Sequence, residues 1–224
     1  LAEIDNQSYA AFGQGSFRLT DRLSATAGLR YTREEKELFL DVRRPNGAIV
    51  VPAQTVAEDF TNTSPRLGLE FQATPDLLTY ASYSRGFKSG GFNIRYVNPA
   101  PAPVAFAPEK LTAYEAGVKW QGLDDRLRLN TAVFYSDYED LQVLIRDAIA
   151  TQIRNAGKAE IYGLEVEANL ALTDMIGLQT ALGYTKAEYE QVPPIVPPAT
   201  ANDQIELSDD FPKTPRWTIS AGSW

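Results

Sequence analysis

The side chains of this chain that could do chemistry are few in kind. Its 224 residues include no cysteine and no histidine, which excludes thiolate nucleophiles, disulfides, histidine acid–base catalysis and the usual zinc or haem ligands. Carboxylates remain, and a pair of them could serve a glycosidase. Glu165 and Glu167 lie about 7 Å apart along one strand, and nothing makes one an acid and the other a base. The sequence therefore predicts no catalytic residue, no metal site and no cofactor.

A second group of side chains is typical of ligand binding. Cations and aromatic residues gather between positions 85 and 106. Cations attract anionic groups and aromatic faces stack on flat rings, so this mixture suits an anionic, ring-bearing iron chelate. It suits packing within a loop equally well, and both alternatives stay open. The candidate ligand-binding residues are Arg85, Lys88, Phe92, Arg95, Tyr96 and Phe106.

Composition and charge narrow the class of protein. The formal net charge of −8 argues against nucleic acid as a partner, because phosphate binding draws on clustered Lys and Arg. Hydrophobic residues make up 44% of the chain. They never form the uninterrupted run of about 18 residues that a membrane-spanning helix needs, which excludes a helical membrane protein.

Four short polar turns recur roughly every fifty residues, and each joins two segments of alternating apolar and polar residues. Long polar connections lie between the hairpins that these turns close. Short turns at one end and long loops at the other are typical of an outer-membrane β-barrel. The turns are Thr20–Arg22, Thr74–Asp76, Asp124–Arg126 and Thr173–Met175.

The alternation predicts which side chains face lipid. In the strand that begins at Leu23, every second residue is apolar, and this row ends at Tyr31. Tyr135 and Tyr184 stand at the same distance from their own turns, about 26 Å along a strand that rises about 3.3 Å per residue. We therefore predict that Tyr31, Tyr135 and Tyr184 form an aromatic girdle at the far headgroup boundary.

The intervening side chains are polar and predict the opposite face. Charges there would be costly in a dry core but cost little in a wet lumen. Strand 77–87 is ambiguous, because Tyr80 and Tyr83 fall on opposite faces. The predicted lumen-facing or plug-facing residues are Arg30, Glu115, Lys119, Arg128, Glu165 and Glu167.

The predicted architecture is all-β, an antiparallel up-and-down transmembrane β-barrel. Bacterial single-chain barrels close with an even number of strands, so an odd number indicates an arc of a larger barrel. We expect long loops at 41–63, 88–111 and 191–213 and a hairpin tip at 147–150. Acidic residues collect in and beside these loops. We predict that they solvate the outer rim, with divalent ions bridging to lipopolysaccharide, and no motif supports the alternative of a specific cation site among them. The nine predicted strands are 8–20, 23–40, 64–73, 77–87, 112–121, 127–146, 151–172, 176–190 and 214–224.

Several segments, in order, resemble the barrel of TonB-dependent outer-membrane receptors. The resemblance covers nearly the whole chain. Its individual motifs are short, and their order and their places on strands and loops carry the likeness. They are Tyr9 to Gln14, Leu19 to Thr32, Tyr80 to Gly91, Pro108-Glu109 with Tyr114 to Lys119, and Asn155-Ala-Gly157 with Gly163 to Glu167.

The resemblance implies a barrel of about 22 strands that is closed by a globular plug. An energy complex in the cytoplasmic membrane pulls on a short N-terminal box to admit a ligand. Residues 1–224 are then expected to be part of that barrel in the cell outer membrane, without plug or signal peptide. The expected partners are outer-membrane lipid and lipopolysaccharide, the TonB complex through the missing N-terminal region, and a small molecule such as a ferric siderophore.

Two other functions remain open from the sequence alone. A passive porin or autotransporter barrel shares the alternation and the girdle. A soluble all-β enzyme, such as a carboxylate-dependent glycosidase, would need the two faces to meet in a dry core. The polar faces of several strands argue against that core.

Overall fold

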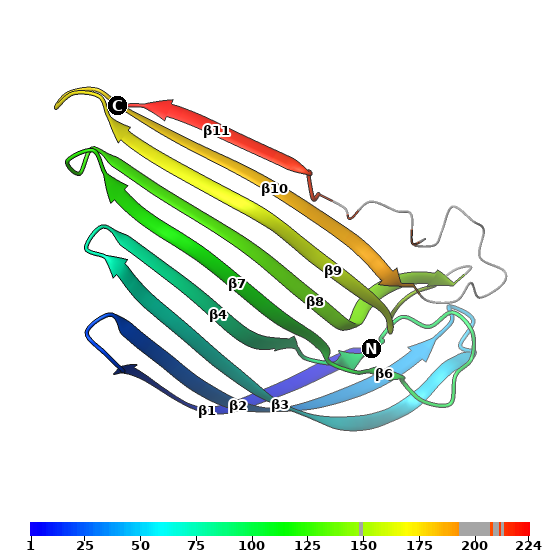
Figure 1. The fold of residues 1–224 in the computed structure, drawn as a ribbon. Coiled ribbons are helices and arrows are strands. Elements are labelled where there is room, and N and C mark those ends of the chain that lie inside the picture. The colour runs from blue at the N-terminus through cyan, green and yellow to red at the C-terminus, as the bar shows by residue number, and fades with distance from the viewer. Residues whose placement is uncertain (148–149, 193–206, 208–210, 212) are drawn as a thin grey trace.

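The computed structural model is built of strands (Figure 1). It describes residues 1–147, 150–192, 207, 211 and 213–224. Within these residues no helix has the length and apolar character needed to cross a membrane. The strands are β1 (Ala2–Arg18), β2 (Leu23–Arg43), β3 (Ile49–Thr74), β4 (Leu77–Lys88), β5 (Gly91–Phe92), β6 (Ala105–Phe106), β7 (Glu109–Gly122), β8 (Leu127–Asp147), β9 (Ala150–Ala171), β10 (Gly177–Gln191) and β11 (Trp217–Ser223).

Nine of these strands form one curved antiparallel sheet in the order β1-β2-β3-β4-β7-β8-β9-β10-β11, while β5 and β6 pair separately (Figure 1). Neighbours in the large sheet are neighbours in the chain apart from the inserted β5–β6 pair, as in an up-and-down barrel. The all-β class and the nine-stranded antiparallel sheet are therefore confirmed.

The four tight turns lie together at one end of the sheet, at the left in Figure 1. Threonine hydroxyls close three of them, because Thr20, Thr74 and Thr173 accept hydrogen bonds from backbone N–H groups two or three residues ahead. The remaining turn uses a left-handed backbone, with φ of 56°, 53° and 65° at Leu123, Asp124 and Asp125. Short polar residues hold such turns without help from packing.

The prediction of a long loop at 41–63 is wrong. Strand β2 runs on to Arg43 and β3 begins at Ile49, so only residues 44–48 form the connection. Gly47, at φ 83°, donates to Arg44 O at 2.9 Å. Polar residues in this segment do not end the strands, because the hairpin extends into water, where both faces can be polar. For the same reason β1 begins at Ala2, opposite Leu40, and not at residue 8.

The predicted loop 88–111 is also more ordered than expected, since it contains the β5–β6 pair. We call residues 89–108, which join β4 to β7, the strap. The strap packs against Leu38, Leu40, Val50 and Val51 at the outer end of the β2–β3 hairpin, and these four side chains are at most 3% exposed. This small core lies beyond the main span of the sheet. Most of the predicted loop 191–213, and residues 148–149 of the hairpin tip, lie outside the described residues.

Candidate functional site: two faces of a wall and an outer strap

The strand register sorts the side chains onto two faces. Opposite residues in an antiparallel pair point to the same side, and the pairs Thr131–Val118 and Thr131–Val166 continue one apolar row across β7, β8 and β9. Large apolar side chains on this face stay open to solvent, with Leu29 at 55% and Val133 at 52% exposed. A continuous apolar surface of this kind marks contact with lipid or with another protein.

A row of aromatic residues closes the apolar band on the side away from the turns. Tyr83, Tyr114, Tyr135 and Tyr162 are opposite one another in successive strand pairs. Ring centroids are 5.3 Å apart for Tyr83 and Tyr114, and 6.3 Å apart for Tyr114 and Tyr135. The register also settles the ambiguity in strand 77–87, since Tyr83 joins this row and Tyr80 faces the other way.

The three tyrosines predicted as a girdle share this apolar face. Tyr135 lies in the row described above, and Tyr184 packs against Trp217 with centroids 4.8 Å apart. Tyr31 lies opposite Thr63 and is 49% exposed. Beyond the aromatic row the same face becomes charged, with ion pairs such as Arg33–Asp59 at 2.8 Å. The apolar band therefore has a boundary on both sides.

The other face carries all six residues predicted to point into a lumen. Across β7, β8 and β9 the register places Lys119 opposite Asn130 and Asn130 opposite Glu167. Within the described part of the chain, no ion pair joins any of the six to a partner. Charged groups that stay exposed without an ion-pair partner in this way need water or a polar partner surface. The six are Arg30, Glu115, Lys119, Arg128, Glu165 and Glu167.

Some of these charges are held by aromatic neighbours. The hydroxyl of Tyr80 donates to Glu115 Oε1 at 2.7 Å, and Lys119 Nζ lies 5.5 Å from the centroid of the Tyr80 ring. Arg30 lies over the ring of Phe12 at 5.7 Å. Cation–π contacts at exposed sites contribute about 0.5–1 kcal/mol, enough to orient these cations without burying them.

Two glycines of the polar face are covered by rings from the neighbouring strand. A Cβ at Gly117 would come within 2.6 Å of the Tyr80 ring. A Cβ at Gly163 would come closest to the backbone oxygen of Tyr184 and would lie within 2.7 Å of the Phe134 ring. Aromatic rings that lie flat over a glycine on the next strand stabilise a sheet where a side chain is missing. This close contact is the physical reason for glycine at both positions.

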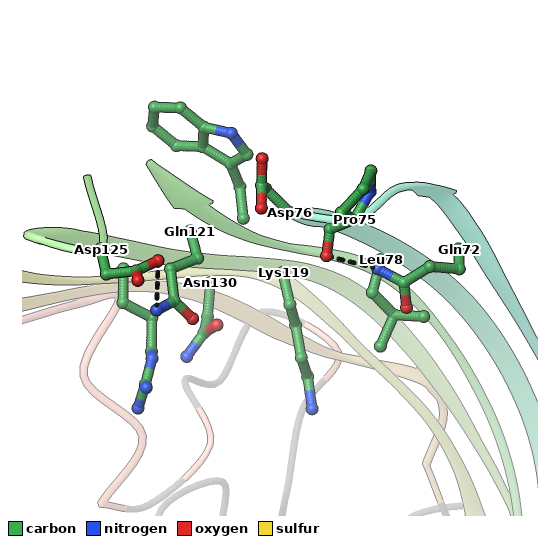
Figure 2. A pocket seen from close by; sticks show the side chains of 10 residues that line it. Gln72, Pro75, Asp76, Leu78, Lys119, Gln121, Asp125 and Asn130 are labelled. Atoms are coloured by element: carbon green, nitrogen blue, oxygen red, sulfur yellow. Dashed lines mark hydrogen bonds between the residues drawn. The ribbon is translucent and has the colours of Figure 1, made fainter. Parts of the chain in front are cut away.

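A hollow of about 490 Å³ opens on the polar face near the turns (Figure 2). In Figure 2, Lys119 and Asn130 point in the same direction from the sheet. Gln121 donates to Asp125 Oδ1 at 3.0 Å across the rim. Its lining holds two cations, Lys119 and Arg128, two carboxylates, Asp76 and Asp125, and several amide groups. Such a mixture suits contact with a polar surface that carries both signs of charge.

The six predicted ligand-binding residues do not come together in one site. Arg85 faces the apolar side and lies 3.9 Å from Glu139, whereas Lys88 is three residues on and points to the opposite face. Phe92 and Tyr96 pack against the small core at the end of the β2–β3 hairpin. Phe106 lies opposite Gly91 in the β5–β6 pair.

Two of the aromatic residues are thus used for packing. The Tyr96 hydroxyl accepts a hydrogen bond from Val104 N at 2.6 Å. Burial raises the pKa of this hydroxyl, and the hydrogen bond offsets only part of the rise. Arg95 is exposed and has no polar partner among the residues that the structure describes. Of the six, Arg95 and Lys88 are therefore the side chains most available to a ligand.

Sequence reasoning missed the side chains that fix the strap. Asn93, Gln142 and Asn155 form hydrogen bonds between the strap and the β8–β9 hairpin. Asn155 stood in a recognised motif, but its role depends on residues far away in the chain. Within the described residues, no group of three or more acidic side chains is arranged to hold a metal ion.

These features define the class of protein. An antiparallel sheet with one apolar face, tight turns at one edge of the band and an aromatic row at the other is the wall of an outer-membrane β-barrel. A family model described as TonB dependent receptor-like, beta-barrel matches residues 2–224. The chain belongs to this family of TonB-dependent receptors and represents part of the barrel. Members of the family are transport receptors, not enzymes, and lie in the outer membrane.

Similar proteins include a metal-pseudopaline receptor and a pesticin receptor. The Metal-pseudopaline receptor CntO of Pseudomonas aeruginosa is 28% identical over 177 residues, which are 78% of this chain and 23% of the relative. The Pesticin receptor of Yersinia pestis is 26% identical over 172 residues, 72% of this chain and 23% of the relative. The chain thus spans about a quarter of the length of these relatives.

Solved structures show the same fold. The ferric yersiniabactin uptake receptor FyuA of Yersinia pestis superposes with a TM-score of 0.80 at 19% identity, over 99% of this chain and 32% of that one. The siderophore receptor PiuA of Acinetobacter baumannii gives 0.74 at 19% identity, over 99% and 31%. The predicted outer-membrane barrel and its family are therefore confirmed.

Proposed function

We propose that this chain is part of the wall of an active importer that takes up a scarce small molecule, a ferric siderophore or similar chelate. The observation that carries the proposal is the two-faced wall. One face is apolar and banded for lipid, while the other is polar and holds charges with no ion-pair partner among the described residues. The relatives named above include siderophore and metal-chelate receptors.

The polar face has the character of a surface that contacts a plug. This face carries both signs of charge, and aromatic rings lie flat over two of its glycines. The charged residues are Glu115, Lys119, Arg128, Glu165 and Glu167. Complementary charges on a plug would pair with them and fix its orientation. The energy source in this proposal is the TonB complex, acting through an N-terminal segment of the full receptor. Lipid and lipopolysaccharide are the partners of the apolar face and of the charged rim beyond it.

Ligand contact is assigned to the outward end of the wall. Arg95 is exposed on the strap and carries a charge that no described residue neutralises. An arginine presents a planar fork of donors that matches carboxylate and catecholate-like oxygens. It therefore provides a contact for an anionic chelate as the ligand enters.

The test uses the full-length receptor in cells that lack the natural copy. Radioactive iron is supplied as a panel of defined ferric siderophores, with and without the energy complex. Uptake that needs both receptor and energy complex supports active import, whereas uptake that persists without the complex favours the passive barrel.

For the transported chelate, Arg95→Glu is expected to weaken affinity about ten-fold, because a charge-assisted contact becomes a repulsion. Arg126→Glu, the same charge reversal at the turn end of the sheet, is the matched control and is expected to leave affinity unchanged. Unaltered affinity in Arg95→Glu would remove the strap from the ligand path while leaving active import in place.

A further inference from the structure

The strap lies above a part of the sheet where the strands are short. Strands β4 and β7 have only 12 and 14 residues, whereas β2, β3, β8 and β9 have 21, 26, 21 and 22. The β2–β3 and β8–β9 hairpins therefore rise beyond the short β4–β7 pair that stands between them. The strap begins and ends on that short pair and runs beside the outer ends of β2 and β3 (Figure 1).

On one side the strap is fixed to the β2–β3 hairpin. Phe92, Tyr96 and Ala100 pack against the buried cluster of Leu38, Leu40, Val50 and Val51. Four hydrogen bonds follow the same seam. They are Ala100 N to Val50 O at 2.9 Å, Lys36 Nζ to Gly90 O at 2.7 Å, Gln54 Nε2 to Pro101 O at 2.8 Å and Arg44 Nη2 to Val97 O at 3.3 Å.

On the other side two asparagines clamp the strap to β9 in opposite directions. Asn93 of the strap donates to Ile153 O at 3.0 Å and accepts from Ile153 N at 2.8 Å. Asn155 of β9 donates to Ala107 O at 2.7 Å and accepts from Ala107 N at 2.6 Å. Each carboxamide pairs with one residue's N–H and C=O as a neighbouring strand would. The seam is thus closed by side chains that imitate a β-ladder.

A third side chain ties the two ends of the strap together. Gln142 of β8 donates from Nε2 to Ser89 O at 2.9 Å and to Ala107 O at 3.0 Å. Its own backbone N–H donates to Glu109 Oε2 at 2.9 Å. Glu109, the first residue of β7, therefore has a definite partner on β8. Hydrogen bonds with the single residue Gln142 therefore hold both the start of the strap after β4 and its end before β7.

We propose that the strap is a fixed segment of the wall that couples the two tall hairpins mechanically, with Asn93 and Asn155 as the positioning residues. Movement of the strap away from β9 would leave the polar groups of Asn93, which is 8% exposed, without their partners. Movement away from β2 and β3 would uncover the buried cluster. Both changes cost free energy, so displacement of one hairpin is transmitted through the strap to the other.

The coupling also fixes the free side of the strap. Ile94 and Val104 are 41% and 59% exposed, and Arg95 lies beside Ile94. These side chains are presented at a constant height above the short β4–β7 pair. The rigidity of this part of the wall does not depend on which ligand the receptor takes.

The test is amide hydrogen exchange on the full-length receptor in detergent micelles. Asn155→Asp replaces the donor NH2 with a carboxylate that faces the carbonyl oxygens of Ala107 and Asp140. We expect exchange at Ala107 to rise at least about ten-fold, and exchange at Ala100 on the far seam to rise with it. Asn98→Asp makes the same change at an exposed strap residue and is expected to alter neither amide.

Acceleration at Ala107 with no change at Ala100 would overturn the coupling, as would equal effects of the two variants. Protection of the β4–β7 ladder reports that the variant has folded. If the β4–β7 ladder is lost in the variant, coupling is tested instead by amide exchange in the unmodified receptor. Coupling then requires the Ala100 and Ala107 amides to show protection factors within about ten-fold of each other, and a larger difference contradicts it.

Discussion

Arginine at one position of β8 tests the assignment of the two faces. Thr131 is the middle residue of the stretch from Leu127 to Tyr135 on the apolar face, and it lies between Val118 and Val166 of the adjacent strands. A lipid-facing arginine at the bilayer mid-plane costs about 2–4 kcal/mol. Since each 1.36 kcal/mol is a factor of ten, Thr131→Arg is expected to lower the folding equilibrium constant about 30- to 900-fold.

The neighbouring residue provides a control at the same depth. Ala132 points to the polar face, between Gly117 and Glu165. An arginine there keeps its hydration and gains an attraction to Glu165, so Ala132→Arg is expected to change stability by less than about 1 kcal/mol. Both free energies are measured by reversible urea unfolding of the full-length receptor in lipid vesicles. Equal costs for the two variants, or a larger cost for Ala132→Arg, would refute the assignment of faces.

Two further predictions concern packing and pH. In Gly117→Ala the new Cβ would lie 2.6 Å from the Tyr80 ring, so the ring must move and lose its hydroxyl hydrogen bond. We expect the free energy of unfolding to fall by about 0.5–1.5 kcal/mol. Gly68→Ala, where the nearest contact of the new Cβ is 3.8 Å away, is expected to leave the free energy of unfolding unchanged. The pKa of Glu190 is raised by its hydrogen bond with Glu160 and by neighbouring negative charge. The folded-state pKa of Glu190 therefore lies above 4.5. The stability that protonated Glu190 contributes through its hydrogen bond with Glu160 is complete below pH 4.5, and it is lost as the pH rises through the raised pKa. Glu190→Gln removes this titration, so unfolding midpoints measured against pH are expected to fall less steeply in the variant. An unchanged pH profile would contradict the raised pKa of Glu190.

Much of the sheet could be predicted from local sequence. Alternation of apolar and polar residues repeats every two positions, so it determines which side chains share a face without any knowledge of distant strands. That is why Lys119 and Glu165 were placed together and why Tyr31 and Tyr184 were assigned to the same face. The turns could be predicted as well, because Thr20 and Thr173 act on backbone groups within three residues.

The register between strands could not be predicted in the same way. The aromatic row through Tyr83 and Tyr114 depends on which residues of β4 and β7 lie opposite one another, and periodicity within each strand does not determine this. The extent of β2 and β3 was missed because polar residues normally indicate a loop in a soluble protein. In a barrel hairpin that projects into water, they are compatible with a strand on both faces.

The strap was beyond sequence reasoning for a different reason. Asn93 and Ile153 are 60 residues apart in the chain, and Asn155 and Ala107 are 48 apart. An asparagine in a loop is ordinarily a turn residue, so its type alone does not indicate a long-range clamp. The same limit applied to Phe92 and Tyr96, whose aromatic side chains are equally suited to a ligand and to the apolar cluster that they contact.

The most direct test of the central claim is a nitroxide accessibility scan along β8 of the full-length receptor in lipid vesicles, one spin label at a time from Leu127 to Tyr135. Oxygen, which concentrates in the acyl chains, is expected to relax labels at alternate positions that include Leu129, Thr131 and Val133, with minima at Asn130 and Ala132. Accessibility without a two-residue period, or with its maxima at Asn130 and Ala132, would contradict the account.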